Sequence, residues 1–307
     1  MNRPPGVSSE PEKTLLTSRA IEFLAAGPAD VVDLIGHVCN LPGAPRIVAE
    51  HMARAMFAGR REFVCGSDGR WLICTEPVAY DSPSHAADGV PHPADCLRNQ
   101  AYVVVDVETT GARPYAGDRI TEIAAVVVRD GAIAEVFETL VNPQRSIPAF
   151  ITQLTNITWE MVKDAPPFAE IAADVMGVLD GKVFVAHNAA FDWRFVSAEV
   201  SRTAGRRLMG RKLCTVKLAR KLLPQLPRRS LDHVARYYGV DINGRHRAAG
   251  DALATAHCLL RMIDDLSDRG CESWSDLEIL LGVSAAKRRT TRRAPAMPAP
   301  VSRDTTA

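Results

Sequence analysis

Apolar residues recur every three or four positions through the first quarter of the chain, which is the spacing of amphipathic helices. Three short helices are predicted there, carried by Leu16, Ala20 and Phe23, by Val31, Leu34, Ile35 and Val38, and by Val48, Met52, Ala55 and Met56. Two short apolar runs follow, Phe63 to Cys65 and Trp71 to Cys74, with Asp68-Gly69 between them as a tight turn of positive φ. Residues 14–76 are therefore predicted to form a small α+β domain.

The pattern changes in residues 101–283. Strands are predicted at 102–107, 120–129 and 132–141, the last two joined in a hairpin by Asp130-Gly131. A helix at 167–180 precedes the wholly apolar strand Val183 to Ala186, which indicates burial on both faces. Further helices are predicted at 190–204, 215–223, 230–239 and 249–267. This order predicts an α/β unit with a mixed sheet covered by helices on both faces.

Two stretches lack apolar periodicity. Residues 77–100 are rich in Pro, Ser, Ala, Asp and His, which predicts a linker. His85, His92 and Cys96 could form a metal site there, but a solvated connector is favoured because nothing would hold the ligands in register. Residues 284–307, with KRRTTRR and Pro-Ala repeats, are predicted to be a disordered basic tail.

Length, cysteine pattern and the distribution of apolar residues indicate the general class of protein. At 307 residues the chain is long enough for one full core and a second small unit. Its seven cysteines include no CxxC pair, which argues against a disulfide framework and structural zinc. The N-terminus has no signal-like apolar core, and no stretch approaches the roughly 20 apolar residues of a membrane span. We expect a soluble, cytoplasmic protein with no membrane partner.

The string VVVDVETTG carries the first candidate chemistry. Asp106 and Glu108 are two residues apart on a predicted strand, so both carboxylates lie on one face. Two like charges held that close repel each other, and a divalent cation with oxygen ligands, Mg²⁺ or Mn²⁺, would neutralise them. The pair predicts a metal-dependent hydrolase.

Two more segments place acids near helix starts. In HNAAFDWRF, Asn188 is a candidate N-cap and Asp192 lies in the first helical turn. In RHRAAGDALATAHCLL, Asp251 falls early in an amphipathic helix, whereas His246 precedes the helix on a predicted loop. We expect Gly250 to let this helix pass close to the strand that bears Asp106.

Together the motifs DVETTG, HNAAFD and HRAAGDA resemble, in order, the pattern of the DEDDh 3′-5′ exonucleases, the DnaQ-like family of the epsilon proofreading subunit of bacterial DNA polymerase III. The resemblance covers about residues 101–268. The stretch LTNIT also looks like the family's LTGIT, with Asn156 in place of Gly; Asn tolerates the left-handed conformation, so the turn can form.

The resemblance implies a ribonuclease H-like, five-stranded mixed sheet and two divalent cations. Asp106, Glu108 and Asp251 would bind one ion, and Asp106 with Asp192 the other. His246 would act as the general base towards the attacking water, since an imidazole pKa lies near operating pH. His187 is the rival base, although a structural role is favoured for it.

The resemblance also implies substrate contacts. Thr109 and Thr110 would hold the terminal nucleotide, with Asn188 nearby. Phe191 could pack beside the last bases or in the core, and both alternatives stay open; of Phe191, Trp193 and Phe195 at least one must pack inward. Asp232 matches a family position, but a surface or capping role serves it equally well.

Charge is unevenly distributed despite a net charge of +1. Residues 206–247 hold twelve Lys or Arg against two Asp, which favours a surface that binds phosphates along the substrate. The candidates are Arg206, Arg207, Arg211, Lys212, Arg228 and Arg229, with Arg211 and Lys212 expected to contact the substrate.

The N-terminal domain resembles a winged helix, and EFVCGSDGRWLI looks like the end of the module in the delta subunit of bacterial RNA polymerase. Its six basic and six acidic residues over 14–75 give duplex binding little support, so contact with another protein is favoured slightly over DNA reading. A polymerase or a repair protein is the expected partner.

The predicted function is a 3′-5′ exonuclease on single-stranded DNA ends, in DNA repair or replication. One alternative keeps the fold and acts on RNA, as RNase T and oligoribonuclease do. Another is a non-catalytic nucleic-acid-binding or scaffold protein, against which the full set of five catalytic residues argues. No clamp-binding segment is evident in the tail, so a dedicated proofreading role is less favoured. Some family members join this unit to a UvrC-like nuclease, and this chain ends too soon for that.

Overall fold

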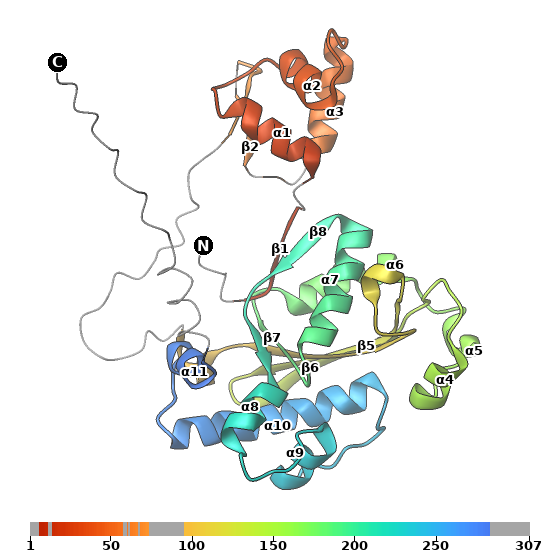
Figure 1. Cartoon of the computed structure of the whole chain (residues 1–307), viewed down its shortest axis with the longest axis vertical. Coiled ribbons are helices and arrows are strands. Elements are labelled where there is room, and N and C mark those ends of the chain that lie inside the picture. Colours follow the sequence, from red (N-terminus) through yellow and green to blue (C-terminus); the bar gives the residue numbers. More distant parts are fainter. Residues whose placement is uncertain are drawn as a thin grey trace, which may run out of the picture.

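The computed structural model describes residues 6–11, 14–57, 60, 62–66, 68–73 and 95–282 (Figure 1). The N-terminal module contains helices α1 (Leu15–Leu24), α2 (Val31–Cys39) and α3 (Arg46–Phe57), followed by the hairpin of β2 (Phe63–Cys65) and β3 (Trp71–Ile73). Its own core joins the helices to the hairpin, and the rings of Phe57 and Phe63 stack with centroids 4.2 Å apart.

The three helices and the hairpin form where the apolar spacing predicted them, and the winged-helix resemblance stays a prediction. The hairpin loop differs from the expected two-residue turn. It extends from Gly66 to Arg70, closed by a Gly66 N–H bond to the Arg70 carbonyl at 2.7 Å, and of the Asp68-Gly69 pair only Gly69 has positive φ. Asp68 instead accepts a hydrogen bond from the Arg70 N–H at 3.0 Å. Cys74 lies outside the described residues.

The second unit is built on a five-stranded sheet in the order β6-β5-β4-β7-β9. The strands are β4 (Tyr102–Thr109), β5 (Ile120–Arg129), β6 (Ala132–Leu140), β7 (Val183–Ala186) and β9 (Lys212–Cys214). β5 is antiparallel to β4 and β6, whereas β7 is parallel to β4 and β9. Asp130 and Gly131 both have positive φ, as their hairpin turn requires. The predicted mixed sheet is confirmed.

Helices cover both faces of this sheet (Figure 1). α6 (Phe168–Leu179) and α7 (Ala190–Ala204) pack on one face, and α8 (Thr215–Leu222), α9 (Leu231–Tyr238) and α10 (Ala248–Asp268) on the other. These helices agree with their predicted ranges to within two residues. The sequence did not predict the short helices α4 (Ala149–Thr155), α5 (Trp159–Val162) and α11 (Trp274–Leu280). Asn156 ends α4 in the left-handed conformation, as LTNIT predicted.

Alternation along β4 decides where the acids lie. Val103, Val105 and Val107 belong to the core with α6 and α7, while Tyr102 and Val104 belong to the core with α10. Because side chains alternate along a strand, Asp106 and Glu108 continue the α10 face at the point where its apolar residues end.

An N-terminal strand was not predicted. β1 (Ser8–Pro11) pairs antiparallel with β8 (Arg206–Met209), and Val7 just before it is only 1% exposed within the core of the second unit. Val7 exchanges backbone hydrogen bonds with the 181–182 turn, at 2.7 Å to the Lys182 carbonyl and 2.9 Å from the Gly181 N–H. The α/β unit therefore includes a segment that precedes the N-terminal module in sequence.

The last residues of the predicted linker 77–100 are part of the α/β unit. Residues 95–100 pack onto the α/β unit: Leu97 is 2% exposed, and its carbonyl accepts a hydrogen bond from the Tyr102 hydroxyl at 2.6 Å. Residues 74–94 and the predicted tail lie outside the described residues. Among the helices that the structure describes, none has the length and apolar character needed to cross a bilayer.

Candidate active site

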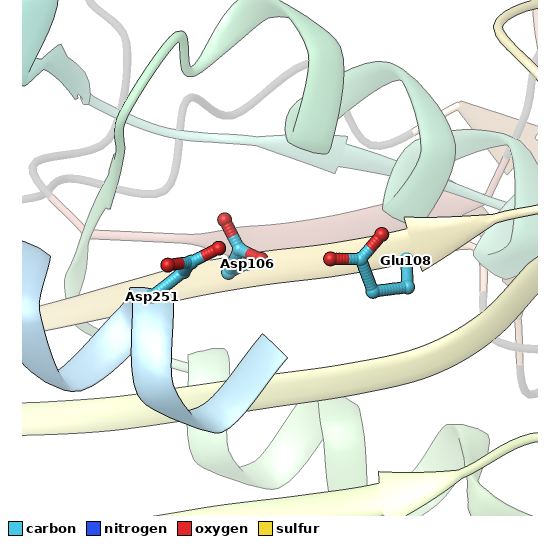
Figure 2. Close-up of side chains that lie close together, drawn as sticks. All are labelled: Asp106, Glu108 and Asp251. Atoms are coloured by element: carbon cyan, nitrogen blue, oxygen red, sulfur yellow. The ribbon is translucent and has the colours of Figure 1, made fainter. Parts of the chain in front are cut away.

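Three carboxylates from two distant segments converge at one end of the sheet. Asp106 and Glu108 project from β4, and Asp251 lies in the first turn of α10, which packs against that strand (Figure 2). Each offers an oxygen, and these atoms lie within 4.8 Å of one another. The convergence expected from DVETTG and HRAAGDA is present.

Burial and mutual repulsion raise the pKa values of this cluster. Burial, with the charges of Asp106 and Asp251 adding to it, raises the pKa of Glu108 to about 8. Burial, followed by the charges of Asp192 and Asp251, raises the pKa of Asp106 well above its usual range. Burial also raises the pKa of Asp251, although the neighbouring Arg245 opposes the shift. The three acids are therefore costly to ionise together without a cation.

The cluster fits a divalent cation with oxygen ligands. Within the described part of the chain, Oδ1 of Asp251 is buried and has no hydrogen-bond partner, which is a free ligand position on a carboxylate that already faces two others. Three hard oxygen donors of this kind suit Mg²⁺ or Mn²⁺. These residues therefore have the chemistry of a metal site.

Asp192 lies in the first turn of α7, as predicted, and is 4% exposed. It stays outside the group of three oxygens, although its charge acts on Asp106. Burial raises the pKa of Asp192 to about 8, while backbone hydrogen bonding, including that of Val107 on β4, opposes the shift. Asp192 therefore borders the cluster from the α7 side of the sheet.

The prediction that Asn188 caps α7 is wrong. The residue before the helix is Ala189, and no side chain caps this end. Asn188 has a φ of 83°, a conformation that asparagine tolerates better than most residues, and its backbone carbonyl accepts a hydrogen bond from Phe191 at 2.9 Å. Asn188 therefore shapes the turn between β7 and α7 through its backbone.

His246 lies on the loop before α10, as expected, with a φ of 63°. Its backbone N–H donates to Oδ2 of Asp251 at 3.2 Å, which places the histidine directly beside the acid cluster. His246 therefore lies outside the helix, on a loop that its own backbone ties to Asp251.

The two arginines that flank His246 hold this loop at both ends. Arg245 donates to Asp232 at 2.9 Å and to Asp251 at 2.6 Å. Arg247 donates to Glu122 at 3.0 Å and 2.5 Å, and this 5% exposed glutamate pairs across the sheet with Glu108. Sequence reasoning missed these partners, although the RHR string, a histidine between two fixed charges, was a signal for them.

Gly250 was expected to let α10 pass close to the strand that bears Asp106, and this reason for the glycine is wrong. A Cβ at this position would lie 1.9 Å from the Asn243 carbonyl oxygen and 2.7 Å from that of Gly244. The glycine therefore makes room for the 243–244 turn of the His246 loop, and not for β4.

His187, the rival base, has both ring nitrogens engaged. Nδ1 lies 2.9 Å from the Thr215 hydroxyl, and Nε2 lies 2.9 Å from the Arg229 carbonyl oxygen. Burial lowers its pKa to about 4, so the ring is neutral near pH 7. This environment agrees with the structural role that was favoured for His187.

The residues predicted to contact the terminal nucleotide make contacts within the protein. The Thr109 hydroxyl donates to the Gly111 carbonyl at 2.6 Å, and the Thr110 hydroxyl accepts from the Arg119 N–H at 3.0 Å, so both shape the loop after β4. Phe191 is partly buried with its ring 4.9 Å from that of Phe195, which is fully buried. At least one of the three aromatics of α7 thus packs inward, as expected.

The basic segment 206–247 does not form a uniform surface. Arg206 donates to the Ser9 hydroxyl at 2.7 Å, and Arg229 donates to the Pro224 carbonyl at 3.0 Å. Arg211 pairs with Asp95 at 3.0 Å and lies over the Trp274 ring, just before β9 and away from the end of β4 that carries the acids. Arg207 and Lys212 remain exposed, with the Lys212 ammonium 4.5 Å from the Trp193 ring centroid.

The chain thus combines a mixed five-stranded sheet, covered by helices on both faces, with a cluster of three acids that suits a metal-dependent hydrolase. The chain belongs to the RNase_T family, described as Exonuclease, whose model matches residues 103–259, just over half of the chain.

Two relatives illustrate the family. The chain is 40% identical over 170 residues to the 3′-5′ exonuclease DinG of Bacillus subtilis. This match covers 55% of this chain and 18% of DinG. It is 37% identical over 197 residues to the DNA polymerase III PolC-type of Caldanaerobacter subterraneus, covering 63% and 14% respectively. The chain thus spans less than a fifth of the length of either relative.

Solved structures similar to this chain include Exonuclease X in complex with 5′ overhanging duplex DNA, with 30% identity and a TM-score of 0.45 over 55% of this chain and 93% of that one. Escherichia coli Exonuclease I in complex with a dT13 oligonucleotide has 16% identity and a TM-score of 0.48, over 55% and 42%.

Proposed function

We propose that this protein is a 3′-5′ exonuclease that releases nucleoside monophosphates from the ends of single-stranded DNA. The observation that carries the proposal is the convergence of Asp106, Glu108 and Asp251, with an unpartnered carboxylate oxygen on Asp251, directly beside His246. Two of the family's relatives carry the words exonuclease and DNA polymerase in their names, which favours a DNA end as substrate.

Each residue has a distinct role in this proposal. Asp106, Glu108 and Asp251 would hold one divalent cation, and Asp106 with Asp192 would hold a second. Two such ions, Mg²⁺ or Mn²⁺, would activate the attacking water and stabilise negative charge on the phosphate and the leaving 3′ oxygen. His246 accepts the proton of the attacking water on a ring nitrogen, and its loop brings the ring to the terminal phosphate.

The loop after β4 orients the end of the strand. Thr109 and Thr110 fix its backbone through their hydroxyl bonds, and the chain near these two residues would contact the terminal nucleotide. Phe191, at the start of α7, would pack beside the last bases with the part of its ring that the core leaves uncovered. Holding the terminal nucleotide next to His246 lowers the entropic cost of the hydrolysis, because the reacting groups are already in position.

The test is degradation of matched single-stranded DNA and RNA oligomers, labelled at the 5′ end, by the full chain in Mg²⁺. Stepwise shortening of DNA from the 3′ end, lost in Asp106→Ala, is the expected result. Faster degradation of the RNA would assign the chain to an exoribonuclease activity instead, and no degradation of either would leave a non-catalytic binding protein.

The N-terminal module is proposed as the contact to a polymerase or a repair protein. Its balanced charge supports a protein partner over a duplex. Pull-down of a purified DNA polymerase and its sliding clamp by the full chain, compared with a chain lacking residues 14–73, tests this contact; equal recovery with both chains contradicts it.

A further inference from the structure

A groove follows α7, and none of its lining residues belongs to the acid cluster. It encloses about 290 Å³, and one wall is formed by three residues one turn apart on α7, Trp193, Ser197 and Ser201. β8 and the residues that follow it supply the opposite wall, including Arg207 and Lys212. Tyr115, on the short 3₁₀ helix η3 (Pro114–Ala116), lines the same groove.

The lining of the groove combines aromatic surface with positive charge. Tyr115 is 76% exposed, and Trp193 is held edge-on against Phe184 with ring centroids 5.1 Å apart. The Lys212 ammonium lies over the Trp193 ring, and Arg207 is exposed. No acidic side chain is among the lining residues. Aromatic faces interleaved with cations are the usual surface for a single nucleic-acid strand, since bases stack and phosphates bind cations.

One polar atom in the groove is also left without a partner. Within the described residues, Oγ of Ser197 is buried and makes no hydrogen bond, in the middle of the α7 wall between Trp193 and Ser201. A buried hydroxyl without a partner costs free energy that a bound polar group would recover. This atom points to a ligand with hydrogen-bonding groups and argues against a purely apolar occupant.

Two elements of the proposed active site also supply residues to the groove. Trp193 directly follows Asp192 on α7, and the segment that carries Thr109 and Thr110 leads to Tyr115. From Trp193 to Ser201 the helix rises about 12 Å at 1.5 Å per residue. The groove therefore shares α7 and the loop after β4 with the proposed active site, and its α7 wall has the length of several stacked nucleotides.

We infer that this groove binds the part of a single strand that lies on the 5′ side of the terminal nucleotides. Bases stack on Tyr115 and pack against Trp193, while Lys212 and Arg207 bind the phosphates and Ser197 donates to a backbone or base oxygen. The inference rests on the proposed exonuclease function and adds a length dependence to it. A dinucleotide occupies the acid cluster alone, whereas a longer strand also fills the groove.

The experiment measures steady-state kinetics of the full chain on oligothymidylates of two, four and twelve nucleotides. For Tyr115→Ala we expect KM on the twelve-mer to rise about tenfold, the lower part of the range for loss of one stacked base, with kcat and the dinucleotide kinetics unchanged. Tyr237→Ala is the matched control, because Tyr237 is also an exposed tyrosine, 49% exposed on α9, and does not line the groove.

A second arm measures binding of the labelled twelve-mer in EDTA, where no cleavage occurs. Lys212→Gln is expected to weaken binding and to lower the slope of log affinity against log salt by about 0.7, the value for one lost phosphate contact on a single strand. This arm is independent of turnover, so it tests the groove even if the chain cleaves nothing and the proposed function fails.

Three results would overturn the groove assignment. The first is that Tyr115→Ala changes KM equally for all three lengths. The second is that Tyr237→Ala raises KM on the twelve-mer as much as Tyr115→Ala does. The third is that both groove variants bind the twelve-mer with the affinity of the wild type. If an oligoglutamate peptide bound in a Tyr115-dependent way and the twelve-mer did not, the groove would belong to an acidic protein partner. If cleavage persists while the length dependence is unaffected, the proposed function stands and the groove alone is rejected.

Discussion

Nη1 of Arg245 lies 2.6 Å from Oδ2 of Asp251, so a fixed positive charge contacts one of the three clustered acids. The same guanidinium binds Asp232 at 2.9 Å, which anchors it on α9. Its charge lowers the pKa of Asp251 against the effect of burial. A divalent cation that binds Asp251 therefore enters a site where an arginine already neutralises part of the negative charge.

Arg245→Gln is expected to bind Mn²⁺ more tightly, by about fivefold. Removing the positive charge of Arg245 relieves its repulsion of the bound cation, and two unit charges about 4 Å apart repel by roughly 1 to 4 kcal/mol. Solvent screens a part of this because the arginine is partly exposed. Titration calorimetry with Mn²⁺ measures the change. Arg220→Gln, an exposed arginine on α8, is the control and is expected to leave the affinity unchanged. Weaker binding by Arg245→Gln would show that the arginine organises the ligands and does not compete with the ion.

Thermal stability without metal is expected to fall as pH rises from about 5 to 9. Burial raises the pKa of Glu108 to about 8, so above the unfolded-state value near 4.5 the folded chain holds a proton that the unfolded chain has lost. Stability therefore decreases through this window and levels off above the folded pKa. Thermal unfolding in EDTA across the range measures it.

In that experiment Glu108→Gln is expected to make the decrease shallower, because the amide does not titrate while the buried Asp106 and Asp192 still do. Saturating Mg²⁺ is expected to reverse the decrease for the wild type, since a bound cation favours the ionised acids. Identical pH profiles for the wild type and Glu108→Gln would contradict the raised pKa.

The acid cluster could be predicted from sequence because each of its members obeys a local rule. Asp106 and Glu108 share a face by strand alternation, and they directly extend the apolar residues that pack on α10. Asp251 falls in the first turn of that helix, whose periodicity fixes the rotation of its side chain. Local periodicity thus determined both the elements and the direction of the three carboxylates.

The remaining features depend on contacts between distant segments, which no local pattern encodes. β1 consists of three polar residues and a proline, follows the buried Val7, and pairs with a strand almost two hundred residues later. The partners of Arg245 and Arg247 lie on α9 and on β5, and only the fold brings them to the His246 loop. The position of Asn188 was missed because its backbone, and not its side chain, makes the turn.

Glu122→Gln is expected to lower the melting temperature and to slow turnover. Glu122 is a buried carboxylate that accepts from Arg247 and from the Ala248 N–H at 2.8 Å, so its loss leaves the arginine without a charged partner and loosens the His246 loop. Because Arg247 is partly exposed, a cost of about 1 to 3 kcal/mol is expected, less than for a fully buried pair.

A double-mutant cycle with Arg247→Met isolates the coupling of this pair. The double variant is expected to be more stable than Glu122→Gln alone, while turnover stays low because the loop remains loose. If the two single effects simply add, the pair does not position the loop.

His246→Ala is expected to reduce kcat by about 10² to 10⁴ with Mn²⁺ affinity intact, since a general base contributes that much and the imidazole is not a proposed ligand. Rate assays at saturating DNA, paired with calorimetry, separate these effects. His187→Ala serves as the comparison: its ring bonds Thr215 and the Arg229 carbonyl, so loss of stability is expected with chemistry largely retained. Loss of metal binding in His246→Ala would remove its assignment as the base.

Gly6→Ala is expected to release β1 from the α/β unit. A Cβ on Gly6 would lie 2.1 Å from the backbone carbon and oxygen of Gly181, and backbone cannot move aside as a flexible side chain can. Amide hydrogen exchange of β8 is then expected to quicken at least about tenfold, because its antiparallel partner strand is lost. Exchange in β4 is expected to stay slow, which distinguishes local release from global unfolding.

The matched control is Gly177→Ala on α6, where an added Cβ meets nothing within 4 Å and alanine favours the helix by up to about 1 kcal/mol. This variant is expected to leave β8 exchange unchanged. Because only residues 12 and 13 separate β1 from the N-cap of α1, release of β1 also frees the attachment of the N-terminal module through its first residues. Unchanged β8 exchange in Gly6→Ala would mean that the β1–β8 pairing does not hold this attachment.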